Sequence, residues 1–185
     1  MQTIDADGLC LRATDWREQD KLITLYLTGK GKITVLAKGC KSPKAKLKFA
    51  ASPLCFGHYY LSCKGGRYVL TGCDCHDSFF QLTTDIEAYY CAMSALELLD
   101  RTANPEEYQN NLFIRTLEFL NELCYTQNNP KQALFAYLGD AVSMLGYRCN
   151  AIRLADYYRF FRNNLDIDLR ALHETIAIVS PIGHP

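Results

Sequence analysis

The spacing of apolar residues along this chain changes near Phe80, from a period of two to a period of about 3.6. Alternation with a period of two is typical of strands, and the longer period is typical of helices. Strands followed by helices favour an α+β protein and argue against alternating βαβ units. We therefore predict a strand-rich domain at residues 1–80 and an all-helical domain at residues 81–185.

Glycine-rich turns separate the strand candidates of the first domain. Gly29-Lys30-Gly31 joins two alternating, β-branched-rich runs, and this spacing predicts a hairpin. Lys64-Gly65-Gly66 separates two further strand candidates. Five short strands with turns of this kind indicate a small closed or nearly closed barrel. The predicted strands are residues 9–14, 22–28, 32–37, 56–63 and 67–73.

Capping signals mark the predicted helices of the second domain. The capping-box pattern Thr84-Asp-Ile-Glu87 predicts the start of the first helix. Asn104-Pro105 and Asn129-Pro130 predict the next two starts, because proline is favoured at the first helical position. Gly146 predicts the end of the third helix. Two further helices are predicted at residues 152–164 and 169–179.

Charge is distributed unevenly in a chain whose formal net charge is zero. Residues 1–80 hold 12 lysines and arginines against 7 acids, and residues 81–185 hold 8 against 13. A stretch without a single aspartate or glutamate carries seven lysines: Lys30, Lys32, Lys38, Lys41, Lys44, Lys46 and Lys48. A solvated, lysine-rich loop is one interpretation, and a folded basic surface that follows a phosphate backbone is the other.

No catalytic pattern is present in the sequence. Thr28-Gly-Lys-Gly-Lys-Ile-Thr34 lacks the glycine spacing and the following helix of a phosphate-binding loop, and four scattered histidines do not pair a base with an orienting group. We therefore predict a protein that is not an enzyme and that uses no cofactor and no small-molecule substrate. The chain also shows no signal-peptide pattern and no apolar run of about 18 residues, so we predict a soluble, cytoplasmic protein without a membrane partner.

Nine cysteines with irregular spacing are best interpreted as reduced thiols used as small apolar residues. Cys63, Cys73, Cys75 and His76 form the one cluster that could hold a metal ion. They lack the paired Cys-x-x-Cys spacing of structural zinc sites. We predict no metal, although spacing alone does not decide whether these four residues bind one.

Aromatic and arginine residues offer two further candidate surfaces. Tyr26, Phe49, Tyr59, Tyr60 and Tyr68 could stack on bases, but strand alternation must turn about half of them inward. In the helical domain, Arg153, Arg159 and Arg162 could bind an acidic partner. The competing interpretation is that these arginines form salt bridges with Asp156, Asp166 and Asp168.

Several segments together resemble one bacterial family, the recombination mediator RecO. The segments are Gly8-Leu-Cys-Leu-Arg12, Asp15-Trp-Arg-Glu-Gln-Asp-Lys-Leu-Ile-Thr-Leu-Tyr26, Gly31-Lys-Ile-Thr-Val-Leu-Ala-Lys-Gly-Cys-Lys-Ser-Pro-Lys44 and Leu145-Gly-Tyr147. The resemblance implies an N-terminal five-stranded OB-fold-like barrel and a helical C-terminal domain. It also implies a nucleoid-associated protein of the bacterial cytoplasm, acting in DNA repair and recombination.

The same resemblance implies partners that the residues alone do not give. These are single- and double-stranded DNA, RecR, and the acidic tail of the single-strand-binding protein, in a role that anneals strands and loads RecA. Two departures matter. Only Cys149 follows Leu-Gly-Tyr, where many members carry a four-cysteine zinc knuckle, so zinc is not carried over. Ala45 stands where the family often has serine.

The basic residues of the first domain are the predicted DNA-binding site, and contacts to phosphates predict binding without sequence preference. An OB-type RNA-binding module and a non-catalytic protein-interaction adaptor are the alternative functions. The predicted site residues are Lys21, Lys30, Lys32, Lys38, Lys41, Lys44, Lys46, Lys48 and Arg67.

Overall fold

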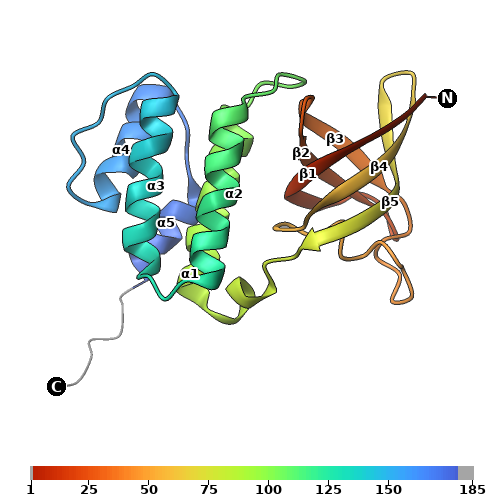
Figure 1. The fold of residues 1–185 in the computed structure, drawn as a ribbon, viewed down its shortest axis with the longest axis horizontal. Helices are drawn as coiled ribbons and strands as arrows, with labels where there is room; N and C mark the ends of the chain where they lie inside the picture. Colours follow the sequence, from red (N-terminus) through yellow and green to blue (C-terminus); the bar gives the residue numbers. More distant parts are fainter. Residues whose placement is uncertain (1, 179–185) are drawn as a thin grey trace. The chain divides into compact units, whose positions relative to one another are not determined.

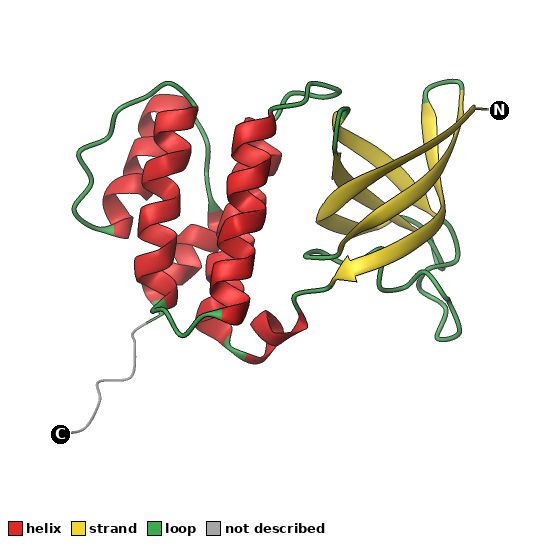
Figure 2. Ribbon diagram, in the orientation of Figure 1, coloured by secondary structure: helices red, strands yellow, loops and turns green. Residues whose placement is uncertain are grey.

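The computed structural model of the protein describes residues 2–178, in which five strands precede five helices and a short 3-10 helix (Figures 1 and 2). The strands are β1 (Gln2–Asp15), β2 (Lys21–Leu27), β3 (Gly31–Ala37), β4 (Phe56–Lys64) and β5 (Arg67–Asp77). The helices are η1 (Phe80–Thr84), α1 (Ile86–Thr102), α2 (Asn110–Tyr125), α3 (Pro130–Met144), α4 (Leu154–Leu165) and α5 (Arg170–Ala177). The expected α+β fold is confirmed.

Two compact units divide the chain. The barrel unit contains the residues up to Phe79 together with Thr102–Asn110, and the helical unit contains Phe80–Arg101 and the chain from Asn111 onward. Thr102–Asn110 connects α1 with α2 and yet belongs to the barrel unit.

The five strands form a closed barrel in the order β1-β2-β3-β5-β4 (Figure 1). All neighbouring strands are antiparallel except β3 and β5, which pair in parallel through Val35 with Tyr68 and Leu36 with Val69. The predicted hairpin across Gly29-Lys30-Gly31 is confirmed, because β2 pairs with β3. The strands β4 and β5 likewise pair across Lys64-Gly65-Gly66. A five-stranded barrel with Greek-key strand order is the OB fold.

Strand β1 closes the barrel and begins earlier than expected. Its first half pairs with β4 and its second half pairs with β2, and Gly8 and Leu9 take part in both pairings. The sequence prediction placed the strand start near Leu9, whereas the strand begins at Gln2. Residues 2–7 include two aspartates, which are depleted in strands. Pairing with β4 overrides that local preference.

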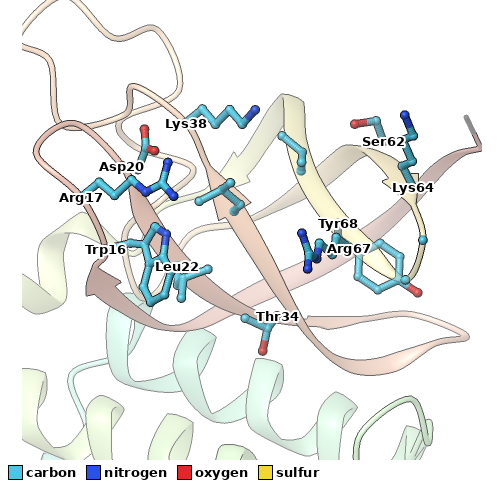
Figure 3. Close-up of a pocket in the computed structure, with 14 residues that line it drawn as sticks. Trp16, Arg17, Asp20, Leu22, Thr34, Lys38, Ser62, Lys64, Arg67 and Tyr68 are labelled. Carbon is cyan, nitrogen blue, oxygen red and sulfur yellow. The ribbon is translucent and has the colours of Figure 1, made fainter.

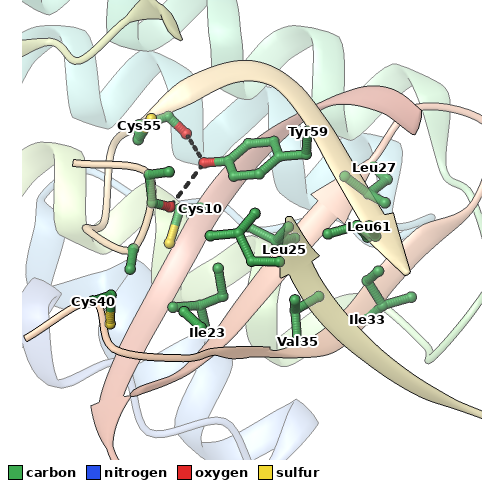
Figure 4. Packing of buried hydrophobic residues seen from close by; sticks show 14 residues of the cluster. Cys10, Ile23, Leu25, Leu27, Ile33, Val35, Cys40, Cys55, Tyr59 and Leu61 are labelled. Atoms are coloured by element: carbon green, nitrogen blue, oxygen red, sulfur yellow. Dashed lines mark hydrogen bonds between the residues drawn. The ribbon is translucent and has the colours of Figure 1, made fainter. Parts of the chain in front are cut away.

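The barrel interior is apolar and carries one buried phenol (Figure 4). Ile23, Leu25 and Val35 come from the inward faces of β2 and β3 and are fully or nearly fully buried. Tyr59 also points inward, and its hydroxyl lies 3.1 Å from the carbonyl oxygen of Cys55 and 3.2 Å from that of Ala50. Burial raises the pKa of Tyr59, so the phenol stays protonated and can donate to these carbonyls.

Residues 38–55 connect β3 with β4 and carry five of the seven lysines of the acid-free stretch. The connection consists of successive turns, and it is attached to the barrel by buried Cys40, Ala50 and Ala51. At its start, the backbone N–H of Gly39 donates to the Asp20 carboxylate at 2.8 Å. These contacts hold the lysine-rich connection as a folded part of the barrel unit.

Residues 103–109 form a strap across the outside of the barrel, where the Asn104-Pro105 pattern predicted a helix start. The backbone N–H of Glu106 donates to the carbonyl of Lys32 at 3.0 Å, and the N–H of Gln109 donates to the hydroxyl of Tyr26 at 2.6 Å. Glu106 has a positive φ of 57°, which a continuing helix does not allow. Hydrogen bonds to the barrel therefore delay the start of α2 to Asn110.

Helix termini in the helical unit follow the predicted pattern in part. Asn129 caps α3 by accepting from the N–H of Gln132, as expected, and Gly146 has a φ of +83° directly after the C-cap residue. The first helix is capped differently: the Asp85 side chain, not Thr84, accepts from the N–H groups of Glu87 and Ala88. The predicted starts of α4 and α5 lie within two residues of the observed ones. The predicted end of the last helix at residue 179 lies outside the described residues.

The core of the helical unit is built on an aromatic pair. The Phe119 and Tyr137 rings are stacked with their centroids 4.6 Å apart, and both side chains are fully buried. The Tyr137 hydroxyl is within 2.9 Å of the Thr116 hydroxyl, which satisfies the polar end of the buried phenol. Glu97 of α1 accepts from the N–H of Ala171 in α5 at 2.9 Å, which ties the last helix to the first.

A histidine on β4 links two acidic residues of β1 on the outer face of the barrel. His58 Nδ1 lies 2.8 Å from Asp7, His58 Nε2 lies 3.3 Å from Asp5, and His76 Nε2 of β5 lies 3.1 Å from the same Asp7 oxygen. The Tyr60 ring meets the edge of the His58 ring. Hydrogen bonding to Asp7 raises the pKa of His58, and the same bond lowers the pKa of Asp7.

We expect His58→Gln to weaken the barrel most in mild acid. A raised histidine pKa contributes stability below the usual value of 6.5, and that contribution is lost as the pH rises through the raised pKa. Urea unfolding of the parent protein and of His58→Gln at about pH 5.5 and about pH 9 measures the change. The free energies of unfolding of the two proteins should differ more at the lower pH. A difference that grows toward high pH would contradict this assignment.

Candidate nucleic-acid interface

A cleft of about 1060 Å³ lies on the outside of the barrel, over β2, β3 and β5 (Figure 3). Leu22 of β2 and Thr34 and Leu36 of β3 lie on the outward side of the strands, because Ile23, Ile33 and Val35 point inward. The residues around the cleft are Trp16, Arg17, Asp20, Leu22, Thr34, Leu36, Lys38, Ser62, Lys64, Gly65, Gly66, Arg67, Tyr68 and Val69.

The charged side chains of the cleft are predominantly cationic. Arg17, Lys38, Lys64 and Arg67 are all exposed, and Asp20 is the one acidic residue among the lining residues. The Asp20 carboxylate already accepts the hydrogen bond from the N–H of Gly39. A cleft with this balance attracts polyanions, and its walls focus the field.

Tight turns place the four cations at the cleft. Lys64 and Arg67 face each other across the β4–β5 hairpin, whose Gly65 and Gly66 both have positive φ values. Arg17 lies in the turn between β1 and β2, which is closed by a hydrogen bond from the N–H of Trp16 to the carbonyl of Asp20 at 3.1 Å. Three separate turns and connections thus bring positive charge to one face of the sheet.

Two aromatic rings border the same cleft. Trp16 is 56% exposed, which is unusual for the largest apolar side chain in a folded protein. Tyr68 also lines the cleft, and the Lys30 ammonium lies 5.3 Å from the centre of its ring. The Tyr68 hydroxyl donates to Glu106 of the strap at 3.2 Å. Cations beside an exposed ring and a half-buried one suit a ligand that combines phosphates with flat, unstacked bases.

The predicted basic residues are divided between the cleft and its surroundings. Lys38 and Arg67 line the cleft, and Lys30 lies at its edge on Tyr68. The hydrogen bond with Tyr68 raises the pKa of Lys30, which keeps the ammonium charged. Lys32 lies near the strap, where it pairs with Pro105 in an isolated bridge, and Lys21 is half-buried at the start of β2.

The other lysines lie on the β3–β4 connection, outside the residues that line the cleft. Lys41 forms a 2.8 Å ion pair with Asp15, and its hydrogen bond lowers the pKa of that carboxyl. Lys44, Lys46 and Lys48 are exposed to solvent. Of the seven lysines of the acid-free stretch, one lines the cleft, one lies at its edge, one lies near the strap, and four lie on the β3–β4 connection outside the lining residues.

Sequence reasoning missed Trp16, Arg17 and Lys64 as members of this cleft. Lys64 was interpreted only as part of a turn, and Trp16 and Arg17 lie among the acids Asp15, Glu18 and Asp20. A signal was available, because the single tryptophan of the chain lies between two predicted strands rather than inside one.

The aromatic candidates differ in burial, and strand alternation explains only part of the difference. Tyr59 and Tyr26 are buried, the first in the barrel core and the second under the strap. Tyr60 is 41% exposed and donates to Asp74, and Phe49 is exposed on the β3–β4 connection. Of the five predicted rings, only Tyr68 lines the cleft.

The four candidate metal residues do not form one cluster, because Cys63 lies apart from the others. Cys63 pairs with Tyr68 near the β4–β5 turn, whereas Cys73 pairs with Tyr59 farther along the hairpin. His76 forms a hydrogen bond with Asp7 and not with a cysteine. Across residues 2–178, no three His, Cys, Asp or Glu side chains are arranged to hold a metal ion.

The arginines of the helical unit differ in their contacts. Arg159 forms a 2.6 Å ion pair with Asp156, and Asp156 also accepts from the backbone N–H of Arg153 at the start of α4. Arg153, Arg159 and Arg162 are all exposed.

Among the helices described, none is long and apolar enough to cross a membrane.

The chain is a two-unit protein in which an OB-fold barrel with a cationic, aromatic-bordered cleft precedes a helical unit. The family model for the N-terminal part of recombination protein O matches residues 1–79, and the model for its C-terminal part matches residues 83–155. The chain belongs to the RecO family, so the resemblance noted from the sequence is confirmed.

Curated relatives named DNA repair protein RecO come from several bacteria. The DNA repair protein RecO of Clostridium perfringens is 37% identical over 124 residues, which cover 65% of this chain and 50% of the relative. The proteins of that name from Acetivibrio thermocellus and Desulfitobacterium hafniense are 26% and 29% identical over 80% and 84% of this chain, and 59% and 56% of the relatives. The chain thus spans between half and three-fifths of the length of these relatives.

Proposed function

We propose that this protein acts in DNA repair as a non-catalytic mediator that binds DNA without sequence preference through the cleft over β2, β3 and β5. Arg17, Lys38, Lys64 and Arg67 contact phosphates, and Trp16 stacks on a base. The lysines of the β3–β4 connection extend the positive surface beyond the cleft.

The observation that carries this proposal is the combination of four exposed cations with an exposed tryptophan in one cleft. Phosphate contacts supply affinity and fix the path of the backbone, but they carry no base information. Stacking is likewise tolerant of sequence, because every base has a π-face. The names of the relatives support a place in DNA repair.

Strand annealing and RecA loading are the finer parts of the proposal. Annealing follows physically if the protein neutralises the phosphates of two strands and leaves the base edges free to pair. The phosphates of the DNA backbone would lie against Lys38, Lys64 and Arg67. The bases would lie toward solvent or on Trp16. RecR and the single-strand-binding protein are the proposed partners in the loading of RecA.

The helical unit is the proposed site for the acidic tail of the single-strand-binding protein. Arg153 and Arg162 carry exposed guanidinium groups on α4 or at its N-cap, and Arg159 would have to exchange its Asp156 partner for a tail carboxylate. A direct test is fluorescence polarisation of a labelled acidic tail peptide with the parent protein and with Arg153→Ala/Arg162→Ala. Equal affinity would remove these residues from the partner site.

We expect Trp16→Ala to weaken binding of a single-stranded oligonucleotide about tenfold, because stacking on one base contributes about 1–3 kcal/mol. Trp16 is the only tryptophan of the chain, so its fluorescence reports on the cleft directly. In the parent protein, oligonucleotide titration should quench this fluorescence with the same midpoint as polarisation of a labelled strand.

A matched control for this experiment is Phe49→Ala. Phe49 is an exposed aromatic residue of the same unit that does not line the cleft, so its removal should leave the affinity unchanged. Unquenched Trp16 together with unchanged affinity of Trp16→Ala would contradict stacking in the cleft.

RNA of equal length separates the alternative functions. Tighter binding of RNA than of DNA favours an RNA-binding module, and no binding of either polymer favours a protein adaptor.

A further inference from the structure

Three cysteines meet at one end of the barrel, away from the residues of the DNA-binding cleft. Cys55 is the last residue before β4, and Cys73 and Cys75 lie two positions apart on β5. The sulfur atoms of Cys55 and Cys75 are 3.9 Å apart and hydrogen-bonded. Cys55 is only 2% exposed and lies at the edge of the barrel core (Figure 4). Cys75 is exposed.

The backbone around Cys55 fixes its position. The Cys55 carbonyl accepts from the N–H of Cys10 at 2.9 Å and from the Tyr59 hydroxyl at 3.1 Å. The preceding residue, Leu54, has a φ of +74° and donates its N–H to the Cys10 carbonyl. Cys75 is held by strand pairing with Gly57. Both thiols therefore sit on fixed backbone, with their sulfur atoms already in contact.

The protonation of the two thiols is unequal. Interaction with Cys73 lowers the pKa of Cys55, and the neighbouring Tyr59 and Cys75 act in the same direction, whereas burial raises the pKa of Cys75. Cys55 is thereby the better nucleophile of the pair, because the thiolate is the reactive form. Cys75 remains a thiol on the solvent side, able to react second.

We propose that Cys55 and Cys75 are a modification site, which hydrogen peroxide converts into a reversible disulfide. The Cys55 thiolate attacks one peroxide oxygen, the O–O bond breaks, and hydroxide leaves and takes up a proton to form water. The Cys75 sulfur then attacks the sulfur of the Cys55 sulfenic acid. An S–S bond forms, the S–OH bond breaks, and the departing hydroxide takes the proton of Cys75.

The electrons balance in this scheme. The two thiols lose two electrons, and peroxide accepts them as it becomes two molecules of water. The sulfur atoms must approach from 3.9 Å to the bond length of about 2.05 Å. Because Cys55 ends the lysine-rich connection, the disulfide would fasten that connection to β5. A dithiol reductant reverses the reaction.

The test is peptide mapping of the full chain after mild hydrogen peroxide, followed by alkylation of the remaining thiols. We expect two of the nine thiols to be lost, a linked peptide that contains Cys55 and Cys75, and full recovery with dithiothreitol. In Cys75→Ala, Cys55 should form a disulfide with any other cysteine at least tenfold more slowly than it forms the Cys55–Cys75 link in the parent protein. Cys73→Ala should still form the link, though more slowly, because Cys55 loses the hydrogen bond that favours its thiolate.

Cys124→Ala is the matched control, since Cys124 is a partly exposed thiol of α2 in the helical unit, and it should form the link at the parent rate. The mapping of the unaltered chain does not depend on any variant folding correctly. A Cys55–Cys73 link, oxidation of Cys55 without any link, or an unchanged thiol count under peroxide would each overturn the proposal.

Discussion

Reversing three cleft charges should abolish most of the affinity for single-stranded DNA. In Lys38→Glu/Lys64→Glu/Arg67→Glu, three exposed cations from two sides of the cleft become anions, so folding should be unaffected. At about 1 kcal/mol for each lost phosphate contact, the expected loss is about 100-fold, and repulsion from the new carboxylates adds to it. Polarisation of a fluorescent oligonucleotide at fixed salt measures the change.

The control variant is Lys44→Glu/Lys46→Glu/Lys48→Glu, which changes the net charge by the same amount. These three lysines are exposed on the β3–β4 connection and do not line the cleft. They act on the ligand through the field of the barrel unit, so their reversal should cost at most about tenfold, and less as salt screens the field. If the control variant loses as much affinity as the cleft variant, the cleft is not the main DNA-binding surface.

The second large effect is expected at Gly31, where the strap crosses the β2–β3 hairpin. Gly31 has a φ of +80°, and a Cβ atom there would collide with the backbone carbonyl of Glu107. Gly31→Ala therefore combines left-handed strain of about 1–2 kcal/mol with displacement of the strap. We expect the free energy of unfolding to fall by about 3 kcal/mol.

Gly29→Ala separates the two causes, because Gly29 has a φ of +73° in the same turn but no atom within 4 Å of the position that a Cβ would occupy. It should cost only the strain of about 1 kcal/mol. Urea unfolding followed by circular dichroism measures both changes, and limited proteolysis at residues 103–109 reports on release of the strap. Equal losses for the two variants would mean that the strap contributes nothing to barrel stability.

Local signals were sufficient to predict the two glycine-rich turns and one helix start. The Gly29-Lys30-Gly31 and Lys64-Gly65-Gly66 turns require positive φ values that glycine provides, and Asn129 caps α3 with its own side chain. Each of these features is decided by residues within a few positions of one another. The expected α+β order followed from the change of period at Phe80.

Long-range pairing explains what the sequence did not reveal. The Asn104-Pro105 helix start was wrong because Glu106 and Gln109 find hydrogen-bond partners on the barrel. Trp16 and Arg67 share a cleft only because β5 pairs with β3 in parallel and β1 closes the barrel on both sides. Lysine spacing could not show that Lys38 would line the cleft while Lys46 would not.

The most direct measurement for the central proposal is the affinity of the unaltered protein for a single-stranded oligonucleotide across a salt series. If several phosphates are neutralised in the cleft, the logarithm of the association constant should fall linearly with the logarithm of salt, by about 0.7 for each phosphate contacted. We predict a slope of about −2 or steeper, which becomes shallower by about 0.7 for each cleft cation replaced by a neutral residue. An affinity that stays constant as salt rises would contradict phosphate binding by this protein.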